Sequence, residues 1–366
     1  MITKDEIEER AAALELHRSN VQRDYVFGWL IAGVFEESQL GSAIALKGGN
    51  AFRKGYFPET RFSDDLDFTT AQGLNSDLVI AEFNKVCSFA QERSGVQFDI
   101  DRNYVVDEQV IDRDRRVYKL RLYFKDFAGG AEHITLKIRV DVTEYDRLYL
   151  PVQERQLIHQ YSDANELSSV IRCVKLEELL ADKLKCLLQR RYAYDLFDLV
   201  YAVFVNQELA VDKSEIVRVF LKKSIFEPSP AAAKRLLLSL PLDLVKGFWG
   251  KVVCPAACRI PFERAVAYSL RAWRPSSPRS VASIAPWPSI QLSFANPFSR
   301  PAASDAFSGS PITAPHVWLS PIRWPTKDAR VMAWLKSIST LTIKPEVGAA
   351  GRESRPSFIT RLNGSN

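Results

Sequence analysis

The sequence lacks an apolar run long enough to cross a membrane and shows no secretory signal at its start. Its longest early apolar stretch, residues 25–35, covers 11 residues between charged neighbours and is typical of a buried helix. The first residues, MITKDEIEER, are acidic and helical in character. We therefore expect a cytoplasmic protein without a membrane segment.

Cysteine is scarce and unpatterned. The five cysteines form no even disulfide framework, and the pair Cys254 and Cys258 has no nearby histidine that would complete a zinc site. This composition favours a reducing compartment and argues against a structural zinc.

A net positive charge is absent from the main body, although the whole chain carries a net +5. Residues 273–366 carry a net +7, whereas residues 1–272 carry −2, which is poor support for a nucleic-acid partner of the body. The last segment also holds twelve of the 19 prolines and five of the seven tryptophans, without a lasting periodic pattern. We interpret residues 273–366 as an aberrant, poorly ordered tail that a frameshift or a fused remnant would explain.

Before this tail, hydrophobic periodicity divides the chain into a mixed part and a helical part. Spacings of three and four predict helices at residues 4–38, 78–93, 174–190, 195–205, 213–221 and 231–238. Alternation predicts strands at residues 42–46, 62–69, 96–106, 116–124 and 133–142, with a solvated hairpin tip at 112–116 and a turn at 125–131. The predicted fold class is α/β, of the α+β kind, with a mixed sheet flanked by helices and a helical second half.

The stretch ALKGGNAFRKGYFPETRFSDDLDFTT, residues 45–70, combines two adjacent glycines with a dense group of carboxylates. Gly48 and Gly49 stand where a predicted strand turns into a helix, so their amides can approach phosphate oxygens. Asn50 is placed to cap that helix. A plain tight turn is the alternative interpretation of the glycines.

The carboxylates of this stretch favour a metal site. Asp65 and Asp67 are two residues apart on a predicted strand, so they share one face, which Arg61 and Ser63 also share. Two adjacent carboxylates raise each other's pKa unless a cation lies between them, and Mg²⁺ carrying a triphosphate is such a cation. Asp64 faces the other way and is expected to be a solvated surface acid. A charge cluster at a loop edge is the alternative for the pair.

Asp141 is the candidate for a third carboxylate. In LKIRVDVTEYD, residues 136–146, it lies on the strand face opposite Ile138 and Val140. A third acid would complete two-metal chemistry. The alternative is an exposed strand acid that pairs with Arg139.

The helical part adds cations in LEELLADKLKCLLQRRYAYDLFDL, residues 176–199. Lys183 and Arg190 are two turns apart and share a helix face, as do Asp195 and Asp198 on the next helix. A lysine and an arginine that face a triphosphate can neutralise the charge that builds up during transfer. A surface helix with many ion pairs is the alternative.

Taken together, KGGNAFRKGYFPETRFSDDLDF and EELLADKLKCLLQRRYAYDLFDL resemble two motifs of the AbiEii/AbiGii-type nucleotidyltransferases, the toxins of type IV toxin–antitoxin and abortive-infection systems. The resemblance implies a polymerase-β-like nucleotidyltransferase fold with a helical C-terminal half. We accordingly expect four segments: N-terminal helices over 1–40, a nucleotidyltransferase core over 41–160, a helical domain over 161–272 and the tail over 273–366.

The resemblance also implies roles for single residues. Gly48, Gly49 and Asn50 would lie at the triphosphate, Asp65 and Asp67 on Mg²⁺, Lys183 at the phosphates, and Asp195 would be a further catalytic acid. Reasoning from the residues adds three candidates for nucleotide binding, Lys47, Ser63 and Arg190. It also adds Asp141 as a candidate metal ligand. Asn50 replaces the more usual Ser or Thr, and Tyr194 stands where the family often has Arg.

The implied function is Mg²⁺-dependent transfer of a nucleoside monophosphate from an NTP to an acceptor, with release of pyrophosphate. The resemblance implies a tRNA acceptor and a cognate winged-helix antitoxin, encoded nearby, that relieves growth inhibition. A nucleotidyltransferase that modifies protein and a catalytically impaired nucleotide-binding or regulatory protein are the alternatives.

Overall fold

A computed structural model of the chain describes residues 2–111, 115–127, 135–206, 208–224 and 242–273. Several expected features lie wholly or mostly outside these residues: the helix at 231–238, the hairpin tip at 112–116, the turn at 125–131 and the tail after Trp273.

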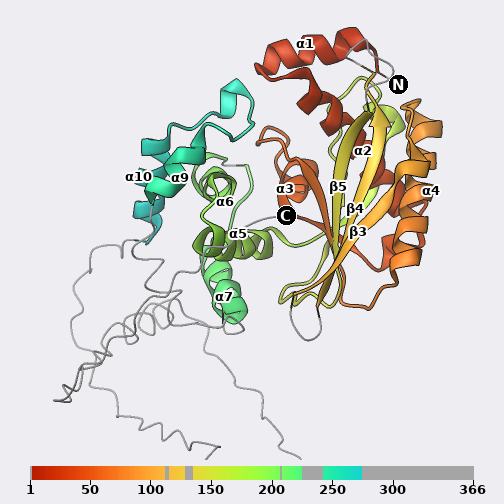
Figure 1. Cartoon of the computed structure of the whole chain (residues 1–366). Coiled ribbons are helices and arrows are strands. Elements are labelled where there is room, and N and C mark those ends of the chain that lie inside the picture. The colour runs from red at the N-terminus through yellow and green to blue at the C-terminus, as the bar shows by residue number, and fades with distance from the viewer. Residues whose placement is uncertain (1, 112–114, 128–134, 207, 225–241, 274–366) are drawn as a thin grey trace, which may run out of the picture. The chain divides into compact units, whose positions relative to one another are not determined.

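The described residues contain a seven-stranded mixed sheet with the strand order β3-β4-β5-β2-β1-β7-β6 (Figure 1). The strands are β1 (Ala45–Lys47), β2 (Asp65–Thr69), β3 (Tyr104–Val110), β4 (Arg116–Lys125), β5 (Thr135–Thr143), β6 (Gln153–Gln156) and β7 (Val170–Cys173). β2 is parallel to β5, and β1 is parallel to β7, whereas the other neighbours are antiparallel. The predicted mixed sheet is confirmed.

Helices precede, interrupt and follow the sheet. They are α1 (Lys4–Leu14), α2 (Arg18–Glu36), α3 (Gly48–Ala51), α4 (Ser76–Ser94), α5 (Leu176–Arg190), α6 (Ala193–Val200), α7 (Lys213–Ser224), α9 (Leu242–Trp249) and α10 (Phe262–Trp273). Short π-helical turns at Phe52–Tyr56 and Tyr201–Val205 extend α3 and α6. Among the described residues, no helix combines the length and apolar character that a membrane crossing requires.

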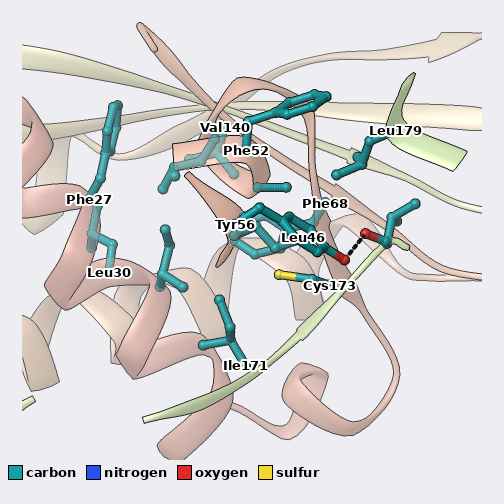
Figure 2. Close-up of a cluster of buried hydrophobic side chains, with 14 of the residues drawn as sticks. Phe27, Leu30, Leu46, Phe52, Tyr56, Phe68, Val140, Ile171, Cys173 and Leu179 are labelled. Atoms are coloured by element: carbon teal, nitrogen blue, oxygen red, sulfur yellow. Dashed lines mark hydrogen bonds between the residues drawn. The ribbon is translucent and has the colours of Figure 1, made fainter. Parts of the chain in front are cut away.

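One face of the sheet is packed against α2 and α4. Leu66 and Phe68 of β2 are fully buried, and the Phe68 ring lies 6.4 Å from Phe35 of α2 and 5.9 Å from Phe83 of α4. The core continues past β1 to β7 and α5 in a cluster that includes Leu46 and other apolar side chains (Figure 2). Because strand side chains alternate, this packing leaves Asp65 and Asp67 on the other face.

The predicted helices before residue 95 and the leucine stripe of α5 are confirmed, since the leucines at positions 176, 179, 180, 184, 187 and 188 are all buried. The strand predicted at 96–106 is wrong over most of its length, because β3 begins at Tyr104. Val96 and Phe98 are both buried in the core, which produces a strand-like alternation of apolar residues in the sequence. In the structure, however, Phe98 forms only an isolated bridge with Phe124.

The sequence prediction missed β6 and β7 altogether. β7 comes from the segment expected to be helical and pairs with β1 through Leu46 and Cys173. Both strands have only four residues, and β6 reads QERQ, so no apolar alternation marks it. The consequence for the site is that β7 leads directly into α5 and fixes the start of that helix beside β1.

Candidate active site

The glycine turn at the end of β1 lies against the acidic strand. Gly48 has φ = +70°, a conformation that favours glycine, and a Cβ there would come within 1.9 Å of the Asp67 Oδ2. A Cβ on Gly49 would come within 2.5 Å of the Ser63 Oγ. The two glycines therefore allow the backbone to approach the carboxylate strand more closely than any other residue would permit.

The expected arrangement of carboxylates is present. Asp65 and Asp67 lie on the face opposite Leu66, and Asp141 of β5 is the direct register partner of Asp67. Asp64 is exposed, and its Oδ1 lies 3.1 Å from the Arg23 Nη1, as expected of a surface acid. Three carboxylates from two parallel strands thus meet on one side of the sheet.

The electrostatics of these carboxylates show their mutual repulsion. Burial and the neighbouring charge of Asp65 raise the pKa of Asp67 to about 7, although Lys47 and Lys183 act in the opposite direction. Burial and the charge of Asp65 also raise the pKa of Asp141 above its ordinary value. A bound cation would remove this repulsion and keep the groups ionised.

The donor set suits a hard cation such as Mg²⁺. Carboxylate oxygens are its preferred protein ligands, and it usually takes only one or two of them together with substrate phosphates and water. Within the described part of the chain, no group of three or more His, Cys, Asp or Glu side chains could hold a metal ion. Asp65 and Asp67 are the pair of carboxylates that would hold Mg²⁺ together with phosphates and water, and Asp141 lies beside them.

Asn50 does not cap the helix, so that prediction was wrong. α3 begins at Gly48, three residues earlier than expected, and its N-cap residue is Lys47, which makes no side-chain capping bond. The Asn50 Nδ2 instead donates to the backbone oxygen of Asp65 at 2.6 Å, while the buried Oδ1 has no hydrogen-bond partner among the described residues. Asn50 therefore fixes the start of the acidic strand and leaves one acceptor unused.

Ser63 and Arg61 lie on the carboxylate side, as their spacing indicated. The Ser63 Oγ donates to the Asp65 Oδ1 at 3.1 Å. The guanidinium of Arg61 is buried and binds both oxygens of Asp198 on α6, at 2.7 and 2.8 Å. This bidentate pair ties the segment before β2 to the helical half.

Lys183 is buried in the same charge cluster. Its Nζ lies 2.8 Å from the Asp198 Oδ2 and 3.4 Å from the Asp195 Oδ1. Burial lowers the pKa of Lys183, but the charges of Asp198 and Asp195 outweigh that effect and leave the pKa above its ordinary value. The interpretation of Lys183 as one member of an exposed, ion-paired helix face is therefore excluded.

Lys183 and Arg190 both contact Asp195, in agreement with the shared helix face that their two-turn spacing predicted. The Arg190 guanidinium binds both oxygens of the fully buried Asp195 at 2.9 Å, while about half of the arginine side chain is exposed. Tyr194, which departs from the family pattern, has its ring 5.1 Å from the Arg61 guanidinium carbon. The aromatic ring thus covers the buried arginine.

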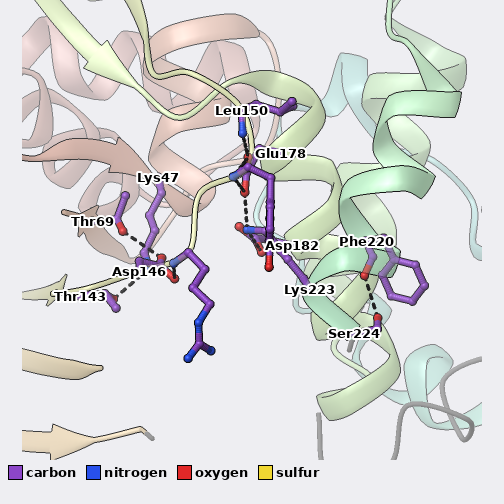
Figure 3. A network of polar contacts seen from close by, with 12 residues as sticks. Lys47, Thr69, Thr143, Asp146, Leu150, Glu178, Asp182, Phe220, Lys223 and Ser224 are labelled. Carbon is purple, nitrogen blue, oxygen red and sulfur yellow. Dashed lines mark hydrogen bonds and ion pairs between the residues drawn. The ribbon is translucent and has the colours of Figure 1, made fainter. Parts of the chain in front are cut away.

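Lys47 lies on the carboxylate side of the sheet, where it is bound by Asp146, a partner that the sequence did not reveal (Figure 3). Lys47 is the register partner of Asp67, and its Nζ donates to the Asp146 Oδ2 at 3.0 Å and to the Thr143 Oγ1 at 2.9 Å. Burial raises the pKa of Asp146, but Lys47 and other cations outweigh this and hold it well below its usual range. Asp146 follows β5 in a loop, where no spacing rule marks it.

A second ionic cluster anchors the chain after Asp146 to the helical half (Figure 3). Glu178 of α5 accepts hydrogen bonds from the backbone of Tyr149 and Leu150. The Lys223 Nζ of α7 lies 2.8 Å from the Glu178 Oε1 and 2.6 Å from the Asp182 Oδ1. The loop that carries Asp146 is thereby fixed to both helices.

The two motif blocks meet at Asp198, which binds Arg61 of the segment before β2 and Lys183 of α5. Lys183 also counteracts the effect of burial, which raises the pKa of Asp67. Sequence spacing placed Asp195 and Asp198 on one helix face, but it did not identify Asp198 as the bidentate partner of Arg61 or Asp146 as the partner of Lys47.

Residues 29–243 match the sequence model of the family described as nucleotidyl transferase AbiEii toxin of the type IV toxin–antitoxin system. Among solved structures, the chain is similar to MenT4, a nucleotidyltransferase toxin from Mycobacterium tuberculosis H37Rv, with 19% sequence identity and a TM-score of 0.47. That similarity covers 76% of this chain and 91% of MenT4. No curated protein matches.

Proposed function

Because the chain belongs to the AbiEii nucleotidyltransferase toxin family, we propose that it transfers a nucleoside monophosphate from an NTP to an RNA acceptor, tRNA in the first place. Transfer requires Mg²⁺ and releases pyrophosphate. The single observation that carries this proposal is the meeting of Asp65, Asp67 and Asp141 beside a glycine turn, which the pair of Arg61 with Asp198 links to Lys183.

Each candidate residue has a role in this proposal. Asp65 and Asp67, with Asp141, hold Mg²⁺, which supplies charge neutralisation at the triphosphate when it is bound. The backbone of Gly48 and Gly49 lies beside the phosphates, where no side chain obstructs their approach.

The remaining candidates supply positive charge and fix the carboxylates. Lys47, Lys183 and Arg190 are the cations that stabilise the charge developing on the phosphates. Asp195 holds Lys183 and Arg190 at the site, which supports its place among the catalytic residues. Ser63 and Asn50 hold Asp65 through its side chain and its backbone.

A toxin of this kind inhibits growth until an antitoxin restrains it. We expect a cognate antitoxin of the winged-helix type, encoded nearby, and a cytoplasmic site of action where NTPs and tRNA are available. Expression of the chain alone should therefore slow growth, and co-expression of the antitoxin should restore it.

The direct test incubates the purified protein with each labelled NTP, Mg²⁺ and total RNA. Label should enter RNA with the wild-type protein and be lost with Asp65→Ala. Asp64→Ala is the matched control, because it removes a neighbouring but exposed carboxylate that faces away from the site. Equal labelling by all three proteins would refute the proposed roles, and label in protein would move the acceptor to a protein hydroxyl.

The competing function is a nucleotide-binding or regulatory protein with impaired catalysis. It predicts that nucleotide binds, depends on Asp65 and yet yields no labelled product with RNA or protein. The intact carboxylates and Lys183 favour transfer, because a protein that had lost catalysis would not need this cluster of partly buried, mutually repelling carboxylates.

A further inference from the structure

Cations gather on the sheet face that continues from the candidate active site. α2 and α4 cover the other face, and Figure 1 shows β5, β4 and β3 side by side next to α4. On the opposite side, β3, β4 and β5 present cations and aromatic rings that are partly or fully exposed. We call this the basic sheet face, and its residues are Tyr104, Lys119, Arg121, Tyr123, Lys137 and Arg139.

The strand register places this face directly beside the carboxylates. Asp65 of β2 is the register partner of Arg139 in β5, and Arg139 is the partner of Arg121 in β4. Arg121 is in turn the partner of Tyr104 in β3. With neighbouring strands roughly 5 Å apart, the face begins one strand away from Asp65 and extends across two more.

The pairing of Arg121 with Arg139 is electrostatically unfavourable. Like charges directly opposite each other on adjacent strands destabilise a sheet. The only carboxylate recorded within ion-pair distance of Arg139 in the described chain is Asp65, and its Oδ2 is 3.9 Å from the Arg139 Nη2. Lys119 lies opposite Asp107 of β3 and Asp141 of β5, so its charge is partly compensated. Among the described residues, Arg121 and Lys137 have no carboxylate within ion-pair distance, and Arg139 has only this long contact, which favours an anionic partner.

Aromatic rings lie among these cations. The Tyr123 ring is on β4 opposite Lys137, and the guanidinium carbon of Arg102 lies 4.4 Å from its centroid. Tyr104 on the edge strand is 48% exposed. Basic side chains interleaved with exposed aromatic rings are typical of surfaces that bind single-stranded nucleic acid, because phosphates meet the cations and bases stack on the rings.

We propose that the basic sheet face binds a single-stranded segment of the RNA acceptor and leads its end to the carboxylates. This proposal rests on the proposed function, since it assigns the acceptor's binding surface. An acidic protein segment would satisfy the cations but would not use the rings, so RNA is the occupant that the surface favours.

The test measures RNA binding without transfer. A fluorescent oligouridine and unfractionated tRNA are titrated with the full-length protein in EDTA, without NTP, over a range of salt concentrations. The variant Arg121→Gln/Lys137→Gln removes two cations that lie outside the carboxylate cluster. The matched control Lys4→Gln/Arg18→Gln removes the same charge from α1 and α2, where both side chains are about half exposed.

The variant should bind oligouridine more weakly than the wild type, and the slope of log affinity against log salt should become shallower by about 1.4, or about 0.7 per lost phosphate contact. The control should keep the wild-type slope. Equal slopes for variant and control, or no binding by the wild type, would overturn the proposal. Polyglutamate binding that matches oligouridine and falls equally in the variant would also overturn it in favour of an acidic protein.

Failure of the binding surface and failure of the proposed function are distinguishable. If the variant binds RNA like the control while the wild type transfers nucleotides, the surface is wrong and the function stands. If the wild type binds RNA through Arg121 and Lys137 but transfers nothing, the surface stands and the transferase proposal fails.

Discussion

The substitution Asp198→Asn tests whether the buried charge cluster joins the carboxylate strand to the helical half. Asp198 is 1% exposed and accepts three short contacts, two from Arg61 and one from Lys183. Burial raises the pKa of Asp198, yet Arg61 and Lys183 outweigh it and hold the pKa below its ordinary value. The carboxylate is therefore ionised in the folded protein at neutral pH.

The expected loss of unfolding free energy follows from the charges that Asp198→Asn leaves without a partner. Three cations, Arg61, Lys183 and Arg190, share the two carboxylates of Asp195 and Asp198, so the substitution leaves three cations with one carboxylate. Removing one partner of a buried ion pair costs about 3–5 kcal/mol of unfolding free energy. This is a large part of the roughly 5–15 kcal/mol that stabilises a typical domain.

Urea unfolding followed by circular dichroism and tryptophan fluorescence measures this loss. The control is Glu15→Gln, which breaks the 2.8 Å pair with Arg259 between side chains that are 61% and 51% exposed. An exposed pair of this kind contributes about 0–1 kcal/mol. A loss below about 1 kcal/mol for Asp198→Asn, no larger than that of the control, would show that the cluster is not a buried, coupled unit.

A double variant distinguishes the loss of ion-pair attraction from the cost of leaving a buried charge without its partner. Arg61→Met with Asp198→Leu removes both charges of the pair and should unfold at higher urea than Asp198→Asn alone, because replacing a buried pair by apolar groups is often neutral. A double variant that is less stable than the single one would contradict the reasoning.

Three further outcomes are expected. Gly48→Ala should cost about 1–2 kcal/mol of unfolding free energy through backbone strain, and it should also reduce nucleotide transfer by displacing Asp67. Gly247→Ala is the control and should not destabilise, because a Cβ there meets nothing within 4 Å. Equal effects of the two variants in unfolding and transfer assays would contradict this prediction. Burial raises the pKa of Asp24, but Arg53 and Lys54 outweigh burial and hold this pKa well below its ordinary value. The ionised Asp24 therefore stabilises the fold at pH values above the unfolded pKa of about 3.9, and this contribution is lost as the pH falls through the folded pKa. The deficit of Asp24→Asn in urea melts should therefore shrink as the solution is acidified below that value, and a constant deficit would refute the assignment. In the presence of Mg²⁺, a non-hydrolysable NTP at a hundred times its Kd should add about 2.7 kcal/mol to the free energy of unfolding. In EDTA the same nucleotide concentration should add much less, so the rise in melting temperature should be smaller. An equal rise with Mg²⁺ and in EDTA would exclude a role of the metal in nucleotide binding.

Local patterns in the sequence predicted the acidic face correctly. Asp65 and Asp67 alternate with buried apolar residues on β2, and the same alternation set Asp141 on β5, so the side that each residue faces followed from a period of two. Lys183 and Arg190 were placed by helical spacing, and both do meet Asp195. Their convergence on the carboxylates required the resemblance, because it depends on contacts more than a hundred residues apart.

Other features could not be predicted because they depend on pairing between distant segments. The basic sheet face is invisible in the linear sequence, since Arg121 and Arg139 become neighbours only through the β4–β5 register. The capping prediction for Asn50 failed because α3 already begins at Gly48, which leaves Asn50 inside the helix with its side chain bound to the Asp65 backbone. A spacing rule describes one element at a time, whereas these contacts arise between elements.

The most direct measurement of the central claim is the binding of Mn²⁺, as a paramagnetic substitute for Mg²⁺, followed by electron paramagnetic resonance with and without a non-hydrolysable NTP. The account predicts that nucleotide tightens Mn²⁺ binding in the wild type and in Asp64→Asn, and that Asp67→Asn loses this effect. Mn²⁺ binding that ignores the nucleotide, or that Asp67→Asn leaves unchanged, would contradict a metal-bridged triphosphate at this strand.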